Sequence, residues 1–368
     1  MVDRSRHNSG NSNKSLGIHQ WLPGFTSGDA ISNYAIGLQE IIRSWGYRSE
    51  IFSPGRHVSP KVRNLCYDWE RYKDYSDPLN TVIYHFSIGS PMSAGFRAIE
   101  DKKVLIYHNI TPDKYFRAIN AEKALVLYQG REELQALYDV PRLALADSEY
   151  NRMELEQWGY RNSAVLPPLL NFNGLKAKPD RKILNQYSGD LLNILFVGRI
   201  APNKKIEDVI KVFYYYKNLV NGKSRLFIVG SFVGMEKYCS YLRAMVLELG
   251  LSNVIFTGHV TTPELAAYYR IADLFLCMSE HEGFGIPLVE SMYYGVPVIA
   301  YRAAAVPYTM GDSGVLVAEK DFPAIAELID IILTRDNIRK KIIEKQKIRL
   351  KDFSRQKIAE QFQAKLFA

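Results

Sequence analysis

Two glutamates, Glu282 and Glu290, lie in the stretch of this sequence that is richest in groups able to do chemistry. They flank a glycine-bearing loop, residues 283–285, and Pro287, a residue that suits the first turn of a helix. Free backbone N–H groups at a helix start bind phosphate, and glycines let the ligand approach closely. Carboxylates beside a phosphate need hydroxyl partners, which a sugar or ribose supplies. The pattern predicts a site for a phosphorylated sugar; the alternative is that both glutamates are solvated charges at a helix end.

Two cations follow the apolar run NILFV, residues 193–197, which we expect to form the first strand of a second domain. Arg199 and Lys204 would then lie at the carboxyl end of that strand, where open parallel sheets bind ligands. Arginine offers a planar fork and lysine a point charge, and together they suit a diphosphate. Fixed cations of this kind would stabilise a departing nucleoside diphosphate. The alternative for each residue alone is a surface charge on a loop.

Short β-branched or aliphatic runs alternate with longer amphipathic stretches along the chain, which predicts α/β domains with parallel sheets covered by helices. A polar segment without periodicity separates two such series. We therefore expect a first domain over residues 15–172, a linker over 173–190 and a second domain over 191–351. We expect residues 1–14 to form a mobile tail. We expect residues 352–368 to form a terminal helix that returns to the first domain. Two such domains would place the site in a cleft between them.

Composition and charge exclude several classes of protein. The chain has 368 residues, of which 47% are hydrophobic and 23% charged, as in soluble globular proteins of two domains. It contains neither an apolar run of the ~18 to 20 residues that span a bilayer nor the apolar core of a signal peptide, which predicts a cytoplasmic protein. Three scattered cysteines and no zinc spacing predict neither disulfides nor a metal site.

The positive net charge of +8 is concentrated near the C-terminus, in residues 335–368. These charges are typical of the solvated face of terminal helices, because apolar residues such as Ile338 and Ile342 supply a buried stripe. The alternative is a peripheral contact with the anionic inner face of a membrane. No aromatic-basic pattern indicates a nucleic acid partner.

The two motifs together resemble the family 4 retaining glycosyltransferases of the GT-B fold. That family has two glutamates separated by seven residues within E-G-F-G-I-P-x-x-E-S-M, and the pattern here is unbroken from Glu282 to Glu290. The family also has an arginine with a lysine five positions later, matched by Arg199 and Lys204. The resemblance implies two Rossmann-like domains facing across a cleft. It also implies transfer of a hexose from a nucleotide diphosphate sugar to a saccharide or lipid-linked saccharide, with retention of configuration.

The resemblance further implies roles for single residues. Glu282 would bind the donor sugar at its 3- and 4-hydroxyls, and Glu290 would bind the ribose hydroxyls. Arg199 and Lys204 would stabilise the diphosphate, so that neither a metal nor a cofactor is required. The other donor-binding residues that it implies are Gly28, Val260, Gly283, Phe284, Gly285, Ile286, Pro287 and Leu288, mainly through backbone groups.

Residues of the first domain complete the implied site. His108 ends the expected strand in KVLIYHNI and would contact the donor sugar as a catalytic residue; His85 could also reach the cleft. The family has two glycines where this chain has Gly28 and Asp29, so Asp29 could serve the acceptor or cap the following helix. Residues 147–148 are expected to cap the next helix.

The identity of the donor is open between two nucleotide sugars. UDP-glucose is the leading one and GDP-mannose the second, since contacts near Val260 do not reveal the base. Two rival functions are a catalytically inactive nucleotide-sugar-binding protein of the same fold and a phosphate-using enzyme of that fold. The acceptor cannot be identified from these residues.

Overall fold

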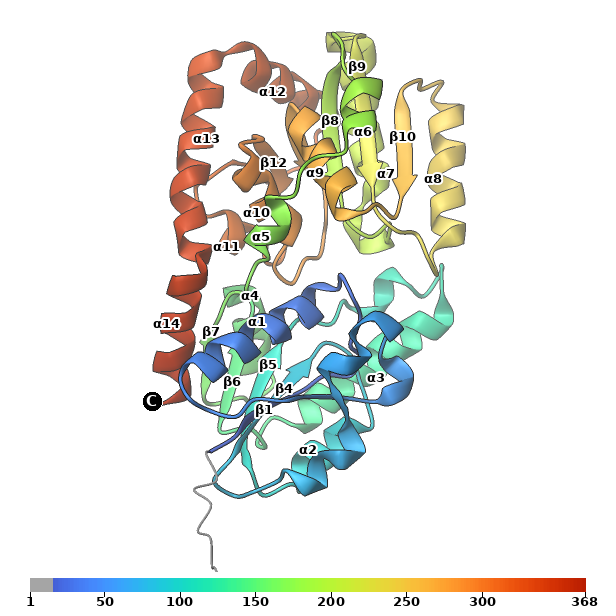
Figure 1. Ribbon diagram of the computed structural model, residues 1–368. Coiled ribbons are helices and arrows are strands. Elements are labelled where there is room, and N and C mark those ends of the chain that lie inside the picture. Colours follow the sequence, from blue (N-terminus) through green and yellow to red (C-terminus); the bar gives the residue numbers. More distant parts are fainter. Residues whose placement is uncertain (1–15) are drawn as a thin grey trace, which may run out of the picture.

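Two parallel sheets form the centres of two domains in the computed structural model, which describes residues 16–368 (Figure 1). The α/β class predicted from the alternation is confirmed, and the expected tail, residues 1–14, lies outside the described residues. The first sheet has the order β3-β2-β1-β4-β5-β6-β7. Its strands are β1 (Ile18–Trp21), β2 (Ile51–Ser53), β3 (Tyr67–Asp68), β4 (Thr81–Phe86), β5 (Lys102–Tyr107), β6 (Leu143–Ala146) and β7 (Ser163–Val165).

Helices cover both faces of the first sheet because its strands are apolar on both sides. In β4, Val82 and Tyr84 pack with one apolar cluster and Ile83 with another. The first cluster includes side chains of α2, α3 and α4, and the second includes α1. The helical segments of this domain are α1 (Ala30–Ser44), η1 (Gly55–His57), η2 (Pro60–Leu65), η3 (Trp69–Asp74), α2 (Met92–Ala98), η4 (Asp113–Tyr115), α3 (Ala121–Ala136) and α4 (Glu149–Gln157).

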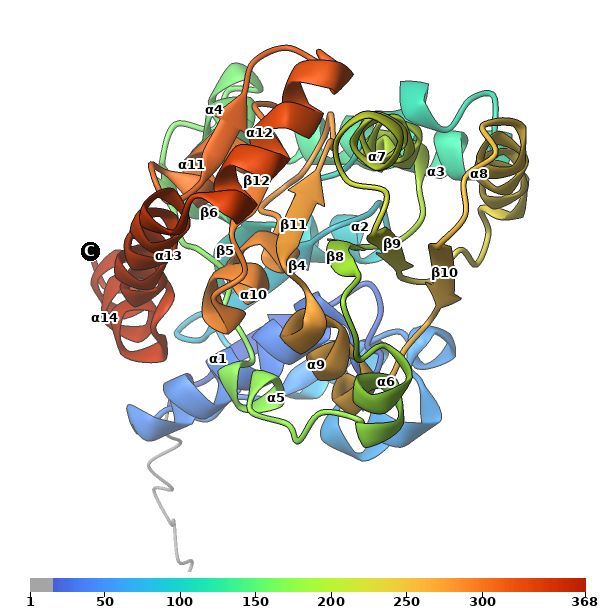
Figure 2. The same cartoon turned by 90° about the horizontal axis from the view of Figure 1, so that it is seen from above.

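The second sheet has the order β10-β9-β8-β11-β12-β13 and is also parallel. Its strands are β8 (Leu192–Val197), β9 (Ser224–Val229), β10 (Val254–Gly258), β11 (Leu274–Cys277), β12 (Val298–Tyr301) and β13 (Val315–Val317). Its helical segments are η5 (Pro202–Lys204), α7 (Ile206–Tyr215), the π-helical η6 (Tyr216–Val220), α8 (Glu236–Glu248), α9 (Thr262–Ile271), α10 (Ile286–Tyr294), α11 (Val306–Met310) and α12 (Phe322–Thr334). Figure 2 shows α7 and α12 on one side of this sheet and α9 and α10 on the other.

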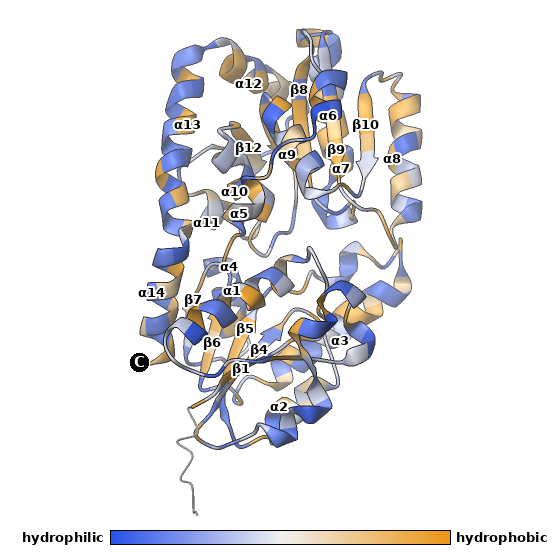
Figure 3. Cartoon of the chain, viewed as in Figure 1, coloured by the Kyte–Doolittle hydropathy of each residue, from blue (hydrophilic) through white to orange (hydrophobic). Residues whose placement is uncertain are grey.

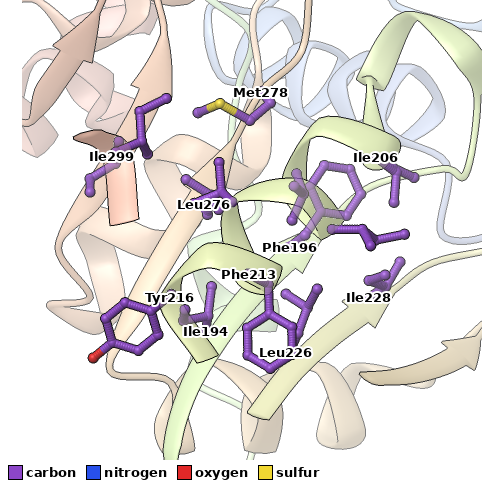
Figure 4. Close-up of a cluster of buried hydrophobic side chains, with 14 of the residues drawn as sticks. Ile194, Phe196, Ile206, Phe213, Tyr216, Leu226, Ile228, Leu276, Met278 and Ile299 are labelled. Carbon is purple, nitrogen blue, oxygen red and sulfur yellow. The ribbon is translucent and has the colours of Figure 1, made fainter. Parts of the chain in front are cut away.

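Alternating side chains of β8 divide the core of the second domain between the two faces. Ile194 and Phe196 belong to the cluster that α7 covers, whereas Leu195 packs on the opposite face. Figure 4 shows Ile194 near Tyr216 of η6, and Phe196 near Ile206 of α7, all in this cluster. Figure 3 shows hydrophobic residues along the central strands and mostly hydrophilic residues along α13 (Asp336–Leu350). This core holds β8 in place and so fixes the loop that follows it.

The segment predicted as a linker is more ordered than its sequence indicates. It contains most of α5 (Phe172–Leu175) and all of α6 (Arg181–Gln186). The Asp180 carboxylate caps α6 by accepting hydrogen bonds from the backbone N–H groups of Lys182 and Ile183, at 2.8 and 3.0 Å. The Ile183 side chain then packs against the second domain. One cap and one buried side chain define a helix too short to show periodicity.

The C-terminal helices join the two domains. After α13, the chain passes through η7 (Lys351–Phe353) into α14 (Arg355–Leu366), which lies beside α1 of the first domain (Figure 1). Ile358, Phe362 and Leu366 lie on one face of α14 and pack in the same cluster as Leu38. Within residues 16–368, no helix combines the length and hydropathy that crossing a membrane requires.

Replacing Phe362 with alanine is expected to lower the free energy of unfolding by about 3 to 5 kcal/mol, because it leaves a cavity among buried side chains. Urea unfolding of the full chain, followed by circular dichroism, measures this change. Gln363→Ala is the matched control, since Gln363 is exposed on the same helix. Equal stability of Phe362→Ala and the control would contradict the packing of α14 on the first domain.

Candidate functional site

A cavity of about 470 Å³ lies between the two domains, at the carboxyl ends of both sheets. Its walls come from the start of α1 and the loops after β1, β5, β6 and β7 in the first domain, and from the loops after β8 and β11 and the start of α10 in the second. The cavity brings together most of the residues predicted from the sequence. Those that line it are His108, Arg199, Lys204, Glu282, Gly283, Phe284, Gly285, Ile286 and Pro287. Gly28, Val260, Leu288 and Glu290 do not line it.

A larger cavity, of about 680 Å³, lies within the first domain between η3 and α2. Its lining includes Trp21, Trp69 and Tyr72, and none of the predicted site residues. Volume therefore does not mark the site in this protein; the convergence of charged groups and free amides does.

The loop before α10 presents backbone donors to the cavity. Gly285 caps the helix with φ of 87°, a left-handed conformation that favours glycine. Among the described residues, no carbonyl accepts a hydrogen bond from the N–H groups of residues 283–286. The Leu288 N–H instead donates to the Gly285 carbonyl at 2.9 Å, and Pro287 has no N–H. The expected amide contact from Leu288 is therefore not met, and the donor set shortens to residues 283–286.

The two domains approach each other closely at Gly283. A Cβ atom on this residue would lie 2.5 Å from the Cβ of Asn109 and 3.1 Å from the carbonyl oxygen of His108. No side chain fits there, so glycine is required by the contact and not only by the flexibility of the loop. Asn109 itself has φ of 71°, which turns the chain sharply after β5.

Arg199 is an exposed cation on the second-domain wall of the cavity. Its side chain forms no hydrogen bond or ion pair within the described part of the chain. The surrounding protein nevertheless displaces enough water to lower the pKa of its guanidinium. A guanidinium that is partly desolvated and unpaired favours an anion in the cavity.

Lys204 and Glu282 form an ion pair across the same wall, with Lys204 Nζ 2.5 Å from Glu282 Oε2. Both side chains are mostly buried, with 20% and 11% of their surfaces exposed. Lys204 ends η5 and Glu282 precedes the glycine loop, so the pair ties together the two loops that follow β8 and β11. The pair places one positive and one negative group beside the free amides.

Glu290 lies in the second turn of α10, behind the cavity wall. One of its carboxylate oxygens accepts a hydrogen bond of 2.7 Å from the Tyr269 hydroxyl. Burial raises the pKa of Glu290, and the bond from Tyr269 opposes that rise. The two glutamates of the motif thus have different surroundings, an ion pair for Glu282 and a neutral hydroxyl for Glu290.

The ring of His108 is turned into the first domain. Its Nδ1 lies 2.9 Å from Asp147 Oδ2, its Nε2 lies 2.8 Å from His85 Nδ1, and only 2% of the side chain is exposed. Because both nitrogens are engaged, the expected direct contact between this ring and the donor sugar is not supported by the geometry. His85 is fully buried and does not line the cavity, although it touches His108.

Asp29 and residues 147–148 lie at the starts of two helices, and Asp29 also lines the cavity, so its contact with an acceptor stays a prediction. The Asp29 carboxylate accepts hydrogen bonds of 2.9 Å from the backbone N–H and the hydroxyl of Ser32, so it caps α1. Gly28 has φ of 83° and is exposed beside that cap. The Ser148 hydroxyl caps α4 as expected, whereas the neighbouring Asp147 holds His108.

Several residues that line the cavity were not predicted from the sequence. Asn109 follows His108 directly, and its place at the end of β5 could have indicated it. The others carried no motif; Asn203, for example, donates from its side chain to the His281 carbonyl at 3.0 Å and supports the loop before Glu282. The further lining residues that the sequence did not indicate are Ala30, Ile31, Tyr34, Thr111, Pro168, Gly198, Asn203 and His281; Asp29 and Asp147, considered above as helix caps, line the cavity as well.

Comparison with known families gives a match to the second domain. Residues 179–349 match the family model described as glycosyl transferases group 1. An O-antigen chain mannosyltransferase B of Escherichia coli is 27% identical over 44% of this chain and 42% of its own length. An uncharacterised protein from the cps region of Klebsiella pneumoniae is 33% identical over 40% of this chain and 38% of its own length. The chain thus spans about two fifths of the length of these relatives.

Comparison with solved structures extends over both domains. A sucrose-phosphate synthase from Thermosynechococcus elongatus superimposes with a TM-score of 0.72 over 96% of this chain and 98% of that one, at 19% identity. Anabaena HepE in complex with UDP superimposes with a TM-score of 0.71 over 95% of this chain and 99% of that one, at 17% identity. These likenesses establish a shared two-domain fold.

Proposed function

We propose that this chain, whose second domain belongs to the group 1 glycosyl transferases and which has the GT-B fold, transfers a hexose from a nucleotide diphosphate sugar to a saccharide or lipid-linked saccharide. The observation that carries the proposal is the unpaired guanidinium of Arg199 in a cavity that residues 283–286, with their free amides, also line. Both groups suit the diphosphate of such a donor.

In the proposed reaction, the bond from C1 of the sugar to the diphosphate oxygen breaks as a bond from C1 to the acceptor oxygen forms on the same face. The acceptor proton passes to the departing diphosphate oxygen, so no side-chain base is needed. Arg199, Lys204 and the amides of residues 283–286 stabilise the charge that develops on the diphosphate. Glu282 orients the sugar through its hydroxyls, and configuration at C1 is retained.

UDP-glucose is our leading donor, because HepE has this fold and was solved with UDP-glucose. GDP-mannose is the second candidate, because relatives 25% identical over 46% of this chain are GDP-mannose-dependent mannosyltransferases. Relatives named for O-antigen and capsular polysaccharide synthesis support an acceptor in polysaccharide assembly. We further propose that the donor binds without a metal.

A thermal-shift panel with UDP, GDP, ADP and their sugars, with and without EDTA, tests the donor. A ligand that binds the folded chain raises the melting temperature as its concentration exceeds Kd. We expect a shift with uridine compounds that EDTA leaves unchanged. A shift with guanosine compounds alone would favour mannose, and loss of the shift in EDTA would contradict binding without a metal. Binding with no detectable transfer to any glycan acceptor would favour an inactive nucleotide-sugar-binding protein.

Gly283→Ala is expected to lower kcat/KM for the donor by roughly tenfold to a hundredfold, because its Cβ must push the loop away from Asn109. The measurement is donor consumption in the presence of an active acceptor. Gly222→Ala is the matched control, since its Cβ would meet only the Lys217 carbonyl, at 3.8 Å. Equal activity of the two variants would contradict a requirement for close contact of the domains at Gly283.

A further inference from the structure

A row of hydrogen-bonded polar side chains crosses the first sheet at the carboxyl ends of four neighbouring strands. Gln20 lies in β1, His85 in β4, His108 directly after β5 and Asp147 directly after β6. These strands are adjacent in the order β1-β4-β5-β6, so each side chain meets the next. The distances are 2.9 Å from Gln20 Oε1 to His85 Nε2, 2.8 Å from His85 Nδ1 to His108 Nε2, and 2.9 Å from His108 Nδ1 to Asp147 Oδ2.

One end of the row fixes which atoms donate. The Gln20 side-chain N–H group donates to the Ala35 carbonyl at 3.0 Å, and that carbonyl can only accept. The amide oxygen of Gln20 therefore faces His85, and His85 Nε2 must carry a proton. Burial and the nearby His108 hold the pKa of His85 well below its ordinary value, so His85 is neutral and its Nδ1 accepts.

The other end of the row requires a further proton. His108 Nε2 must donate to His85 Nδ1, and His108 Nδ1 faces the carboxylate of Asp147. Three bonds therefore need three protons. Two neutral imidazoles and an ionised carboxylate supply only two.

We propose that this row holds three bridging protons, which makes His108 an imidazolium paired with Asp147, and that His85 and Gln20 are positioning residues for the first-domain wall of the donor site. The role at the donor site rests on the proposed function, whereas the proton count does not. His108 lines the cavity, and its carbonyl oxygen would lie 3.1 Å from a Cβ on Gly283. The row thus fixes the part of the first domain that the glycine loop touches.

No other charged group contacts the two rings in the described part of the chain. From α1, the ring of Tyr34 packs edge-on against both, with centroids 5.8 Å from His85 and 5.6 Å from His108. Burial and the Asp147 charge raise the pKa of Tyr34, so its hydroxyl stays neutral. Loss of the third proton at high pH would leave two lone pairs facing each other and would break one of the three bonds. Donor use should then decline on the alkaline side.

Nitrogen-15 NMR of histidine-labelled full-length protein at neutral pH tests the proton count. We expect both ring nitrogens of His108 to be protonated and only Nε2 of His85. The N–H···N bond between the rings gives a nitrogen–nitrogen coupling that identifies this pair in the unsubstituted protein. A singly protonated His108, or His85 unprotonated at Nε2, would overturn the proposal.

Gln20→Leu tests whether Gln20 sets the positions of the protons on His85 and His108. Without the amide oxygen, His85 can move its proton to Nδ1 and donate to His108, so that two protons satisfy the remaining two bonds. We expect His108 to become neutral in this variant and the alkaline decline in kcat/KM to disappear, because the neutral pair of rings keeps both remaining bonds. Gln363→Leu, at an exposed glutamine of α14, is the matched control for activity. An unchanged alkaline limb would refute the positioning role, and absence of glycosyl transfer would contradict the proposed function without affecting the NMR result.

Discussion

Replacing Arg199 with alanine is expected to lower kcat for transfer from the nucleotide sugar by roughly a hundredfold to a thousandfold, the usual loss when one donor to a developing anion is removed. The guanidinium has no partner within the described residues, so the variant leaves no buried charge uncompensated. The unfolding free energy should therefore hardly change. The effect should appear in the diphosphate-dependent step and also in the affinity for the free nucleoside diphosphate.

Lys204→Ala should also weaken binding of the diphosphate, but with an added cost in stability. Lys204 pairs with Glu282 in the free protein, so its loss removes a cation from the diphosphate and leaves a mostly buried carboxylate unpaired. We expect both weaker diphosphate binding and a lower melting temperature, whereas Arg199→Ala shows the first effect alone.

Steady-state kinetics and calorimetric titration with free nucleoside diphosphate measure these effects. Lys340→Ala is the matched control, because it removes one exposed cation from α13, away from the cavity. It should leave both quantities unchanged and so exclude an effect of net charge. Activity of Arg199→Ala equal to that of Lys340→Ala would refute the assignment of the diphosphate site.

The second-domain half of the site was predictable because its signals are local. The glycine loop, the proline at the start of α10 and the cations after β8 all lie within short stretches whose elements the hydrophobic pattern reveals. Strand-end placement then brought Arg199 and Glu282 to one cavity, as parallel sheets require. The backbone hydrogen bonds of this loop could not be predicted from the sequence. Only the structure shows that the Leu288 N–H donates to the Gly285 carbonyl and closes a turn.

The first-domain half was less predictable because it depends on neighbours that are far apart in the chain. His108 was expected at the cavity, but the direction of its ring follows from His85 and Asp147, which the strand order places beside it. Asp29 had two roles of equal merit in sequence; its two bonds from Ser32 show the helix cap, and its contact with an acceptor stays a prediction. Periodicity reports burial of a residue and not the identity of its partner.

Glu282→Gln and Glu290→Gln are expected to separate sugar recognition from nucleotide recognition. Glu290 is withdrawn behind the wall and held by Tyr269, an arrangement that leaves its second oxygen to accept from ribose hydroxyls. Loss of a charge-assisted hydrogen bond costs about 1.5 to 3 kcal/mol. The affinity of Glu290→Gln for free UDP or GDP should therefore be lower by roughly tenfold to a hundredfold. Tyr269→Phe should produce a smaller loss of the same kind, because it frees the carboxylate without removing it.

Glu282→Gln should leave the affinity for free nucleoside diphosphate nearly unchanged and lower kcat/KM for the nucleotide sugar. Glu282 lines the cavity next to the free amides, where the hexose would lie, and the amide retains the size of the carboxylate. Its loss also releases Lys204 from the ion pair, which can only favour an incoming diphosphate. Calorimetry with the free nucleotide, set beside kinetics with the intact donor, compares the two variants directly. Equal losses of affinity for the free nucleotide in Glu282→Gln and Glu290→Gln would mean that both carboxylates serve the nucleotide, and the hexose would then need other partners in the cavity.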